Sequence, residues 1–195
     1  MNALRFVEHC IDTYADRAWR MAYALLSNTH DADDLLQQAF VIAWRKADQA
    51  PRDNPWPWLA AIIAGEAYNA RRKRSRRTAA PLDQAGDPAM QANQQRELEQ
   101  AELHALVYLA LNQLSPEQRI AIVLTHLSGL TQEQAAKAVG VPLDTLKARV
   151  RRGMDKLREV VRADDGKIEK LLLTLPAAFG IGGLSALKAG WLSAV

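Results

Sequence analysis

Residues 140–157, GVPLDTLKARVRRGMDKL, combine a glycine turn with a segment rich in lysine and arginine. A helix-turn-helix unit needs a small residue where its helices approach, a residue that tolerates positive φ in the turn, and an apolar anchor on the second helix. Ala136, Gly140 and Leu146 supply these at spacings of four and six. The stretch therefore predicts a turn between two helices that pack closely.

The second helix of this unit has two distinct sides. One side is apolar at helical spacing, through Leu146, Val150, Met154, Leu157 and Val161. The cations lie mostly off that stripe, and no acid interrupts them between Thr145 and Arg152. A merely solvated helix surface, the alternative, would be expected to interleave acids for i,i+4 pairing. The pattern favours a helix that contacts DNA phosphates and base edges.

Upstream of this unit, helix-capping motifs predict further short helices. SPEQ at 115–118 and TQEQ at 131–134 both have the pattern of a capping box, the first with proline at the initial helical position. Gly129 suits a helix C-terminus. Apolar stripes precede and follow the first box, so these helices are expected to pack on one another.

The N-terminal block is also helical by periodicity. Apolar residues recur through Trp19, Tyr23 and Leu26, and a second stripe is expected through Leu35, Leu36, Phe40 and Trp44. Three prolines in residues 50–58 must break the chain before a new helix starts near Trp58. That helix is expected to run into RRKRSRR at 71–77, which holds six cations in seven positions.

Composition narrows the possible functions. The net charge is +3, and the single cysteine excludes an intramolecular disulfide. The histidines show no metal-ligand spacing, and no nucleophile–base motif or phosphate-binding glycine loop is present. The N-terminus carries acids where a signal peptide needs an apolar core. We therefore expect a cytoplasmic protein without cofactors that is not an enzyme.

The chain resembles the sigma-70 family of bacterial sigma factors, in its extracytoplasmic-function (ECF) group. Residues 111–161 are similar to region 4, residues 31–44 to region 2.2, and residues 55–77 to regions 2.3 and 2.4. The resemblance implies an all-α fold with a region 2 helical bundle at residues 1–77 and a region 4 helix-turn-helix domain at 98–163. A flexible linker is expected at 78–97 and an apolar C-terminal extension at 164–195.

The resemblance also implies a transcription initiation factor and assigns roles to individual residues. Core RNA polymerase would be bound by Asp33, Asp34 and Gln37. The −10 promoter element would be contacted by Tyr68, Asn69, Arg71, Arg72 and Arg74. The −35 element would be contacted by Thr145, Lys147, Arg149, Arg151 and Arg152. An anti-sigma factor is a further expected partner, although no residue of the sequence identifies it.

Two alternative functions remain open from the sequence. The chain could instead be a stand-alone helix-turn-helix regulator, or a sigma-like interaction protein impaired in promoter opening. The second alternative rests on Ala64 and Gly65, two small residues where many relatives have a polar pair that faces the −10 strand. The apolar extension could pack on the domains, be weakly ordered, or touch a membrane, and the membrane interpretation is the less favoured.

Overall fold

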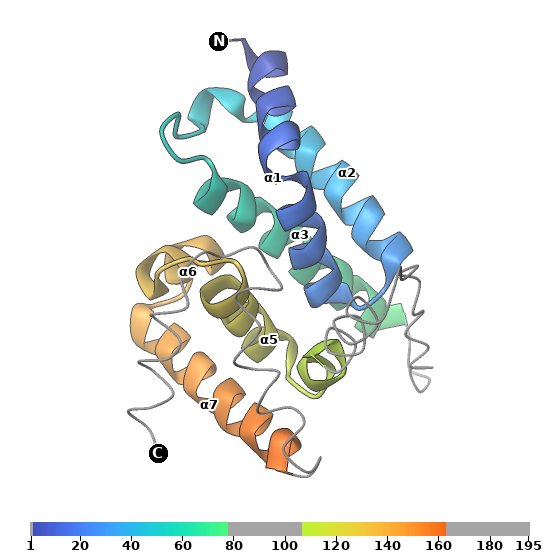
Figure 1. The fold of residues 1–195 in the computed structure, drawn as a ribbon, viewed down its shortest axis with the longest axis vertical. Coiled ribbons are helices and arrows are strands. Elements are labelled where there is room, and N and C mark those ends of the chain that lie inside the picture. The colour runs from blue at the N-terminus through green and yellow to red at the C-terminus, as the bar shows by residue number, and fades with distance from the viewer. Residues whose placement is uncertain (1, 78–106, 163–195) are drawn as a thin grey trace, which may run out of the picture.

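A computed structural model of the chain describes residues 2–77 and 107–162, and the predicted linker and C-terminal extension lie outside them. All regular elements of the described residues are helical, which confirms the all-α prediction. The helices form two bundles (Figure 1). The N-terminal bundle contains α1 to α3, and the C-terminal bundle contains residues 107–112 and α5 to α7. No helix of the described residues is long and apolar enough to cross a bilayer.

Local signals set the ends of the helices in the N-terminal bundle. α1 spans Ala3–Leu26, and α2 spans Thr29–Arg45; asparagine side chains cap both N-termini by accepting from the backbone N–H of Arg5 and Asp31 at 2.9 Å. Ser27 ends α1 in the left-handed region at φ 56°. The short helix η1 (Ala47–Gln49) leads into the proline-rich loop, and α3 spans Trp56–Arg77.

The apolar stripe of α2 differs from the predicted one at Trp44. Ala32, Leu35, Ala39 and Ala43 are buried, whereas Trp44 is 52% exposed. Nine residues at 100° per residue place Trp44 half a turn away from Leu35, so the two side chains cannot share a face. The prediction that Trp44 continues the apolar stripe of Leu35 is therefore wrong. Trp58 is half-buried and packs edge-on against Phe6.

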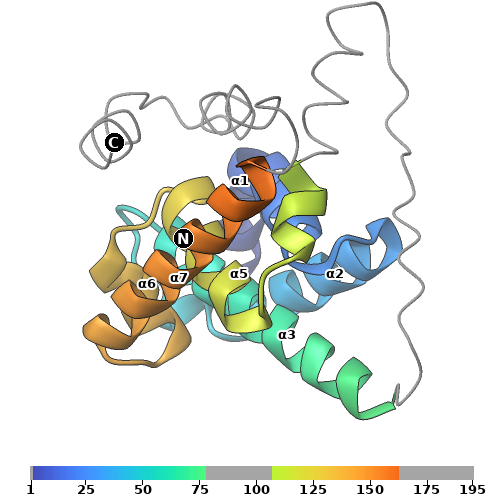
Figure 2. The same ribbon diagram turned by 90° about the horizontal axis from the view of Figure 1, so that it is seen from below.

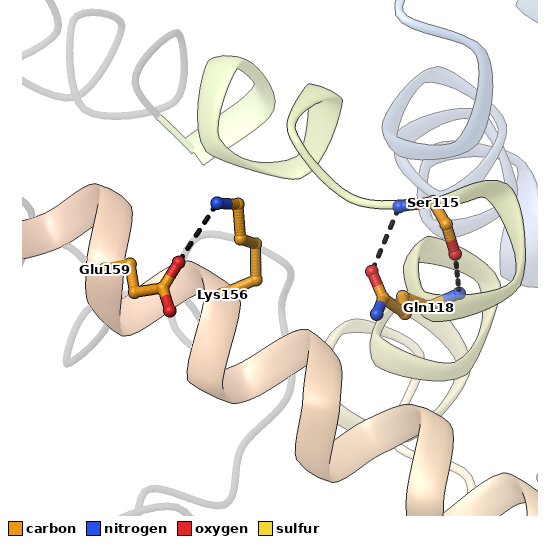
Figure 3. A network of polar contacts seen from close by, with 4 residues as sticks. All are labelled: Ser115, Gln118, Lys156 and Glu159. Carbon is orange, nitrogen blue, oxygen red and sulfur yellow. Dashed lines mark hydrogen bonds and ion pairs between the residues drawn. The ribbon is translucent and has the colours of Figure 1, made fainter.

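The helices of the C-terminal bundle begin at the predicted capping motifs. α5 spans Pro116–Ile122, α6 spans Gln132–Val139, and α7 spans Leu143–Arg162. Both predicted capping boxes are formed; in the first, Ser115 and Gln118 exchange side-chain and backbone hydrogen bonds (Figure 3). One feature departs from the predicted pattern: α5 continues as the π-helix η2 (Val123–Leu127), and Gly129 follows with φ 63°.

The two bundles lie against each other. α3 packs along α6 and also touches α5 (Figures 1 and 2), while α1 contacts η2. Apolar side chains from both bundles form one continuous buried cluster. The described part of the chain is therefore a single packed body built from two helical units.

Candidate nucleic-acid and polymerase interfaces

The turn between α6 and α7 has the geometry that the sequence predicts. Gly140 ends α6 at φ 69°, where a residue with a β-carbon would be strained. The N–H of Val141 donates to the carbonyl of Ala136 at 3.1 Å, which closes the turn. Ala136 and Leu146 are both buried, Leu146 completely. The small residue, the turn and the apolar anchor thus fix α7 at a defined angle to α6.

α7 presents its cations away from this apolar side. Lys147, Arg151 and Arg152 are exposed, and Thr145 and Arg149 are half-buried. The described ion pairs of α7 lie in its C-terminal half, between Lys156 and Glu159 at 3.0 Å (Figure 3) and between Arg158 and Asp155 at 2.7 Å. The N-terminal half of α7 therefore keeps the charge pattern that phosphate contact requires.

The predicted −10 residues lie along the second half of α3. Tyr68 is 42% exposed, Asn69 and Arg72 are exposed, and Arg71 is half-buried. The side chain of Arg74 lies outside the described set. Ala64, by contrast, is 1% exposed. It therefore does not face solvent as a strand-contacting position would, because α3 packs along α6.

The two predicted DNA-binding faces meet at a pocket of about 240 Å³ between the bundles. Gly65 and Tyr68 of α3 line one part of it. Leu146 and Arg149 of α7 line another part, and α6 supplies Ala138 and Val139. A β-carbon added at Gly65 would meet no atom within 4 Å, so the glycine is not required by close packing.

The predicted polymerase-binding residues share the exposed side of α2. Asp33, Asp34 and Gln37 are all exposed. Asp33 is also part of the fold, because its Oδ1 accepts a hydrogen bond from Trp19 Nε1 at 2.8 Å. Asp34 and Gln37 are therefore the cleaner positions at which to test a partner contact.

Sequence reasoning did not anticipate the polar contacts that join the bundles. Arg119 is fully buried and donates to the carbonyls of Leu111 at 2.8 Å and Leu25 at 3.3 Å, and to Ser27 Oγ at 3.2 Å. Burial, and then the neighbouring Arg71, lower the pKa of the Arg119 guanidinium to about 9, so it stays charged at neutral pH. No periodic signal marks such a residue, because its partners in the other bundle, the Leu25 carbonyl and Ser27 Oγ, lie 94 and 92 positions away in the sequence.

A second contact joins α1 and α3 to the residue after η2. Arg17 Nη2 and Trp56 Nε1 both donate to the carbonyl of Ser128, at 2.7 and 2.8 Å. The Arg17 guanidinium also lies 4.2 Å from the centroid of the Trp56 ring. Burial lowers the pKa of Arg17. The sequence does not indicate the carbonyl partner of Trp56, which lies 72 positions away.

No group of three or more metal-ligating side chains occurs within residues 2–77 and 107–162. Cys10 is a buried free thiol whose pKa is raised by burial. Tyr68 and Arg149 do line one pocket, and an aromatic ring beside a cation suits nucleic acid.

Comparisons with known proteins agree with this geometry. The family model for sigma-70 region 2 matches residues 10–77, and the model for sigma-70 region 4 matches residues 104–157. The ECF RNA polymerase sigma factor SigE of Mycolicibacterium smegmatis is 34% identical over 154 residues, covering 78% of this chain and 60% of SigE. The chain thus spans less than two thirds of that relative. EcfG of Rhodopseudomonas palustris is 33% identical over 145 residues, covering 73% of this chain and 78% of EcfG.

Two solved structures are also similar to this chain. The sigma factor RpoE of Bartonella quintana, in complex with the anti-sigma factor NepR, is 32% identical with a TM-score of 0.60, covering 83% of this chain and 94% of RpoE. CnrH, in complex with the cytosolic domain of CnrY, shares the fold at a TM-score of 0.58 and 24% identity, covering 83% of this chain and 96% of CnrH. With both family regions matched in order on two packed helical units, the chain belongs to the sigma-70 family, in its ECF group.

Proposed function

We propose that this protein is a transcription initiation factor that brings core RNA polymerase to specific promoters. The observation that carries the proposal is the pairing of a region 2 match with a region 4 match on one chain. A stand-alone helix-turn-helix regulator is not favoured, because it has no need of the region 2 bundle. We assign the protein no catalytic step of its own and place its work in the cytoplasm.

The promoter contacts fall to two helices. α7 would enter the major groove of the −35 element, with Arg149 as the candidate for a bidentate guanine contact. Exposed cations of α7 would hold phosphates on either side. α3 would serve the −10 element, where strand opening exposes bases and Tyr68 can stack on one of them. Asn69, Arg71, Arg72 and Arg74 would hold the backbone around it.

The polymerase contact falls to α2. Asp33, Asp34 and Gln37 provide a polar surface on its exposed side. An anti-sigma factor is a further proposed partner, supported by the solved complex of the relative RpoE with NepR.

Run-off transcription with purified core polymerase tests the proposal, using as template the DNA upstream of the gene that encodes the chain. We expect transcript that depends on the protein and falls at least tenfold in Asp34→Ala/Gln37→Ala, since about 1.4 kcal/mol of lost binding has this effect. Asp12→Ala, the same change at an exposed position of α1, is the matched control. Binding of this DNA without any polymerase-dependent transcript would favour the stand-alone regulator instead.

A further inference from the structure

Trp19 of α1 is hydrogen-bonded to one of the residues proposed to bind polymerase. Its indole Nε1 donates to Oδ1 of Asp33 on α2 at 2.8 Å. α1 and α2 form a hairpin that turns at Ser27 and Asn28, so residues 14 positions apart come into contact. Asp33 is exposed, and its second oxygen, Oδ2, has no hydrogen-bond partner among the described residues. The carboxylate therefore has one oxygen bound to the fold and one available to a partner.

Aromatic packing fixes the position of the Trp19 ring. Tyr23, one turn further along α1, stacks on it with ring centroids 5.3 Å apart and an interplanar angle of 6°. Tyr108 in turn packs edge-on against Tyr23, with centroids 4.5 Å apart. Because the Nε1–H bond lies in the plane of the indole, a ring that cannot turn gives its donor a fixed direction.

The Trp19 donor is neutral, and this preserves the charge that α2 presents. Three acids occur within four positions, at Asp31, Asp33 and Asp34. A lysine or arginine at position 19 would also bind the Asp33 carboxylate, but it would offset the negative charge. The indole N–H orients the carboxylate and leaves its full charge for a cation of the partner. An aspartate without such a donor is distributed among three staggered χ1 positions.

We infer that Trp19 is a positioning residue for polymerase binding, which holds the Asp33 carboxylate in one orientation with Oδ2 directed to a basic group of the polymerase. The inference rests on the proposed function, and specifically on the place of Asp33 at the polymerase interface. Trp19 itself does not contact the polymerase in this arrangement. A side chain that is ordered before binding loses less conformational entropy when the complex forms.

A double-mutant cycle between Trp19→Phe and Asp33→Ala tests the inference in the full-length protein. Phenylalanine keeps a ring that can stack on Tyr23, but it lacks the Nε1 donor to Asp33. Trp58→Phe is the matched control, because Trp58 is also half-buried and its ring packs against Phe6 on another helix.

Biolayer interferometry with immobilised core RNA polymerase gives the affinity of each variant. Trp19→Phe should weaken binding about threefold, because one χ1 position out of three is no longer favoured before binding. In the Asp33→Ala background the same change should have no further effect, whereas a general structural defect would weaken both backgrounds equally. Trp58→Phe should bind as the wild type does. Heteronuclear NMR of the free protein should show the Trp19 indole resonance displaced by Asp33→Ala, which reports the hydrogen bond directly.

Four results would overturn the inference. The first is a Trp19 indole resonance that Asp33→Ala does not move. The second is an equal loss of affinity on Trp19→Phe in both backgrounds, which would mean that Trp19 contacts the polymerase or that its loss damages the fold. The third is full affinity of Trp19→Phe beside a weakened Asp33→Ala, which would make the orientation of the carboxylate irrelevant to binding.

The fourth result is full affinity of Asp33→Ala, which would remove Asp33 from the interface. The proposed function would then stand on the loss of transcript in Asp34→Ala/Gln37→Ala. A wild-type protein that does not bind the core polymerase at all would instead contradict the proposed function, and the positioning role of Trp19 with it.

Discussion

α3 and α7, the two helices proposed to contact promoter DNA, each carry a glycine in their interior, and the two glycines have opposite surroundings. A β-carbon at Gly153 of α7 would lie 3.0 Å from Ile122 Cγ1 and 3.4 Å from its Cδ1. A β-carbon at Gly65 of α3 would meet nothing within 4 Å. Gly153 lets α7 approach α5 closely, whereas Gly65 borders the pocket between the bundles.

This difference separates two ways of presenting a DNA-binding helix. α7 is pressed onto its own bundle along one side and keeps its cations exposed on the other. α3 is covered on a second side as well, because Ala64 and Ala67 are buried and α6 packs along it. The exposed cations of α7 are therefore accessible to DNA phosphates while the bundles are packed, whereas the Ala64 and Ala67 side of α3 is covered by protein.

Removal of the exposed cations of α7 should give the largest effect. For the triple change Lys147→Gln/Arg151→Gln/Arg152→Gln, we expect DNA affinity at low salt to fall on the order of a hundredfold, because charge-assisted contacts are lost. The slope of log affinity against log salt should decrease by about one per cation. Anisotropy titrations at several salt concentrations measure both. Arg158→Gln, which removes a cation of the same helix that is paired with Asp155, is the control, and an equal loss there would refute the assignment.

Gly153→Ala should have the next largest effect, on the stability of the protein. The added methyl must displace Ile122, so the free energy of unfolding should fall by about 1–2 kcal/mol even though alanine favours helices. Chemical denaturation of the full chain measures this value. Combined with Ile122→Ala, which vacates the space, Gly153→Ala should no longer destabilise. If the single change proved stabilising, the close approach of α7 to α5 would not be real.

Gly65→Ala should have a smaller effect of opposite sign. Nothing obstructs the new methyl, and alanine is favoured over glycine in a helix by up to about 1 kcal/mol. Thermal unfolding followed by circular dichroism should show a raised midpoint. A lowered midpoint would mean that α3 and α6 approach more closely than the pocket allows.

Protonation of His126 should have the smallest effect, which is seen as a change of the free energy of unfolding with pH. Burial lowers the pKa of His126 in η2, whereas α7 contains no histidine. The unfolded chain therefore binds a proton near pH 6.5 that the folded protein does not, so stability should fall as the pH decreases through that value. The fall should stop once the pH is below the folded pKa. Denaturation curves of His126→Gln should lack this component, and an unchanged pH profile would assign it to other groups.

Local signals in the sequence account for much of the fold. Capping boxes, the positive φ at Gly140 and the apolar stripe of α7 depend on residues a few positions apart, so periodicity and spacing determine them. The same reasoning fails at Trp44, because the predicted apolar stripe joined it to Leu35, which points to the opposite side of the helix. It does not predict η2 either, because a widened turn depends on the packing around it.

The sequence alone determined that the chain has two helical units and that α7 carries cations opposite an apolar stripe, since these follow from short-range order. Only the tertiary structure decided that Arg119 is buried against Leu25 and Ser27, that Arg17 and Trp56 share the Ser128 carbonyl, and that Tyr68 and Arg149 line one pocket. Those contacts join residues from about 70 to 110 positions apart in the sequence, largely through backbone carbonyls, which every residue possesses, so no pattern of side chains announces them.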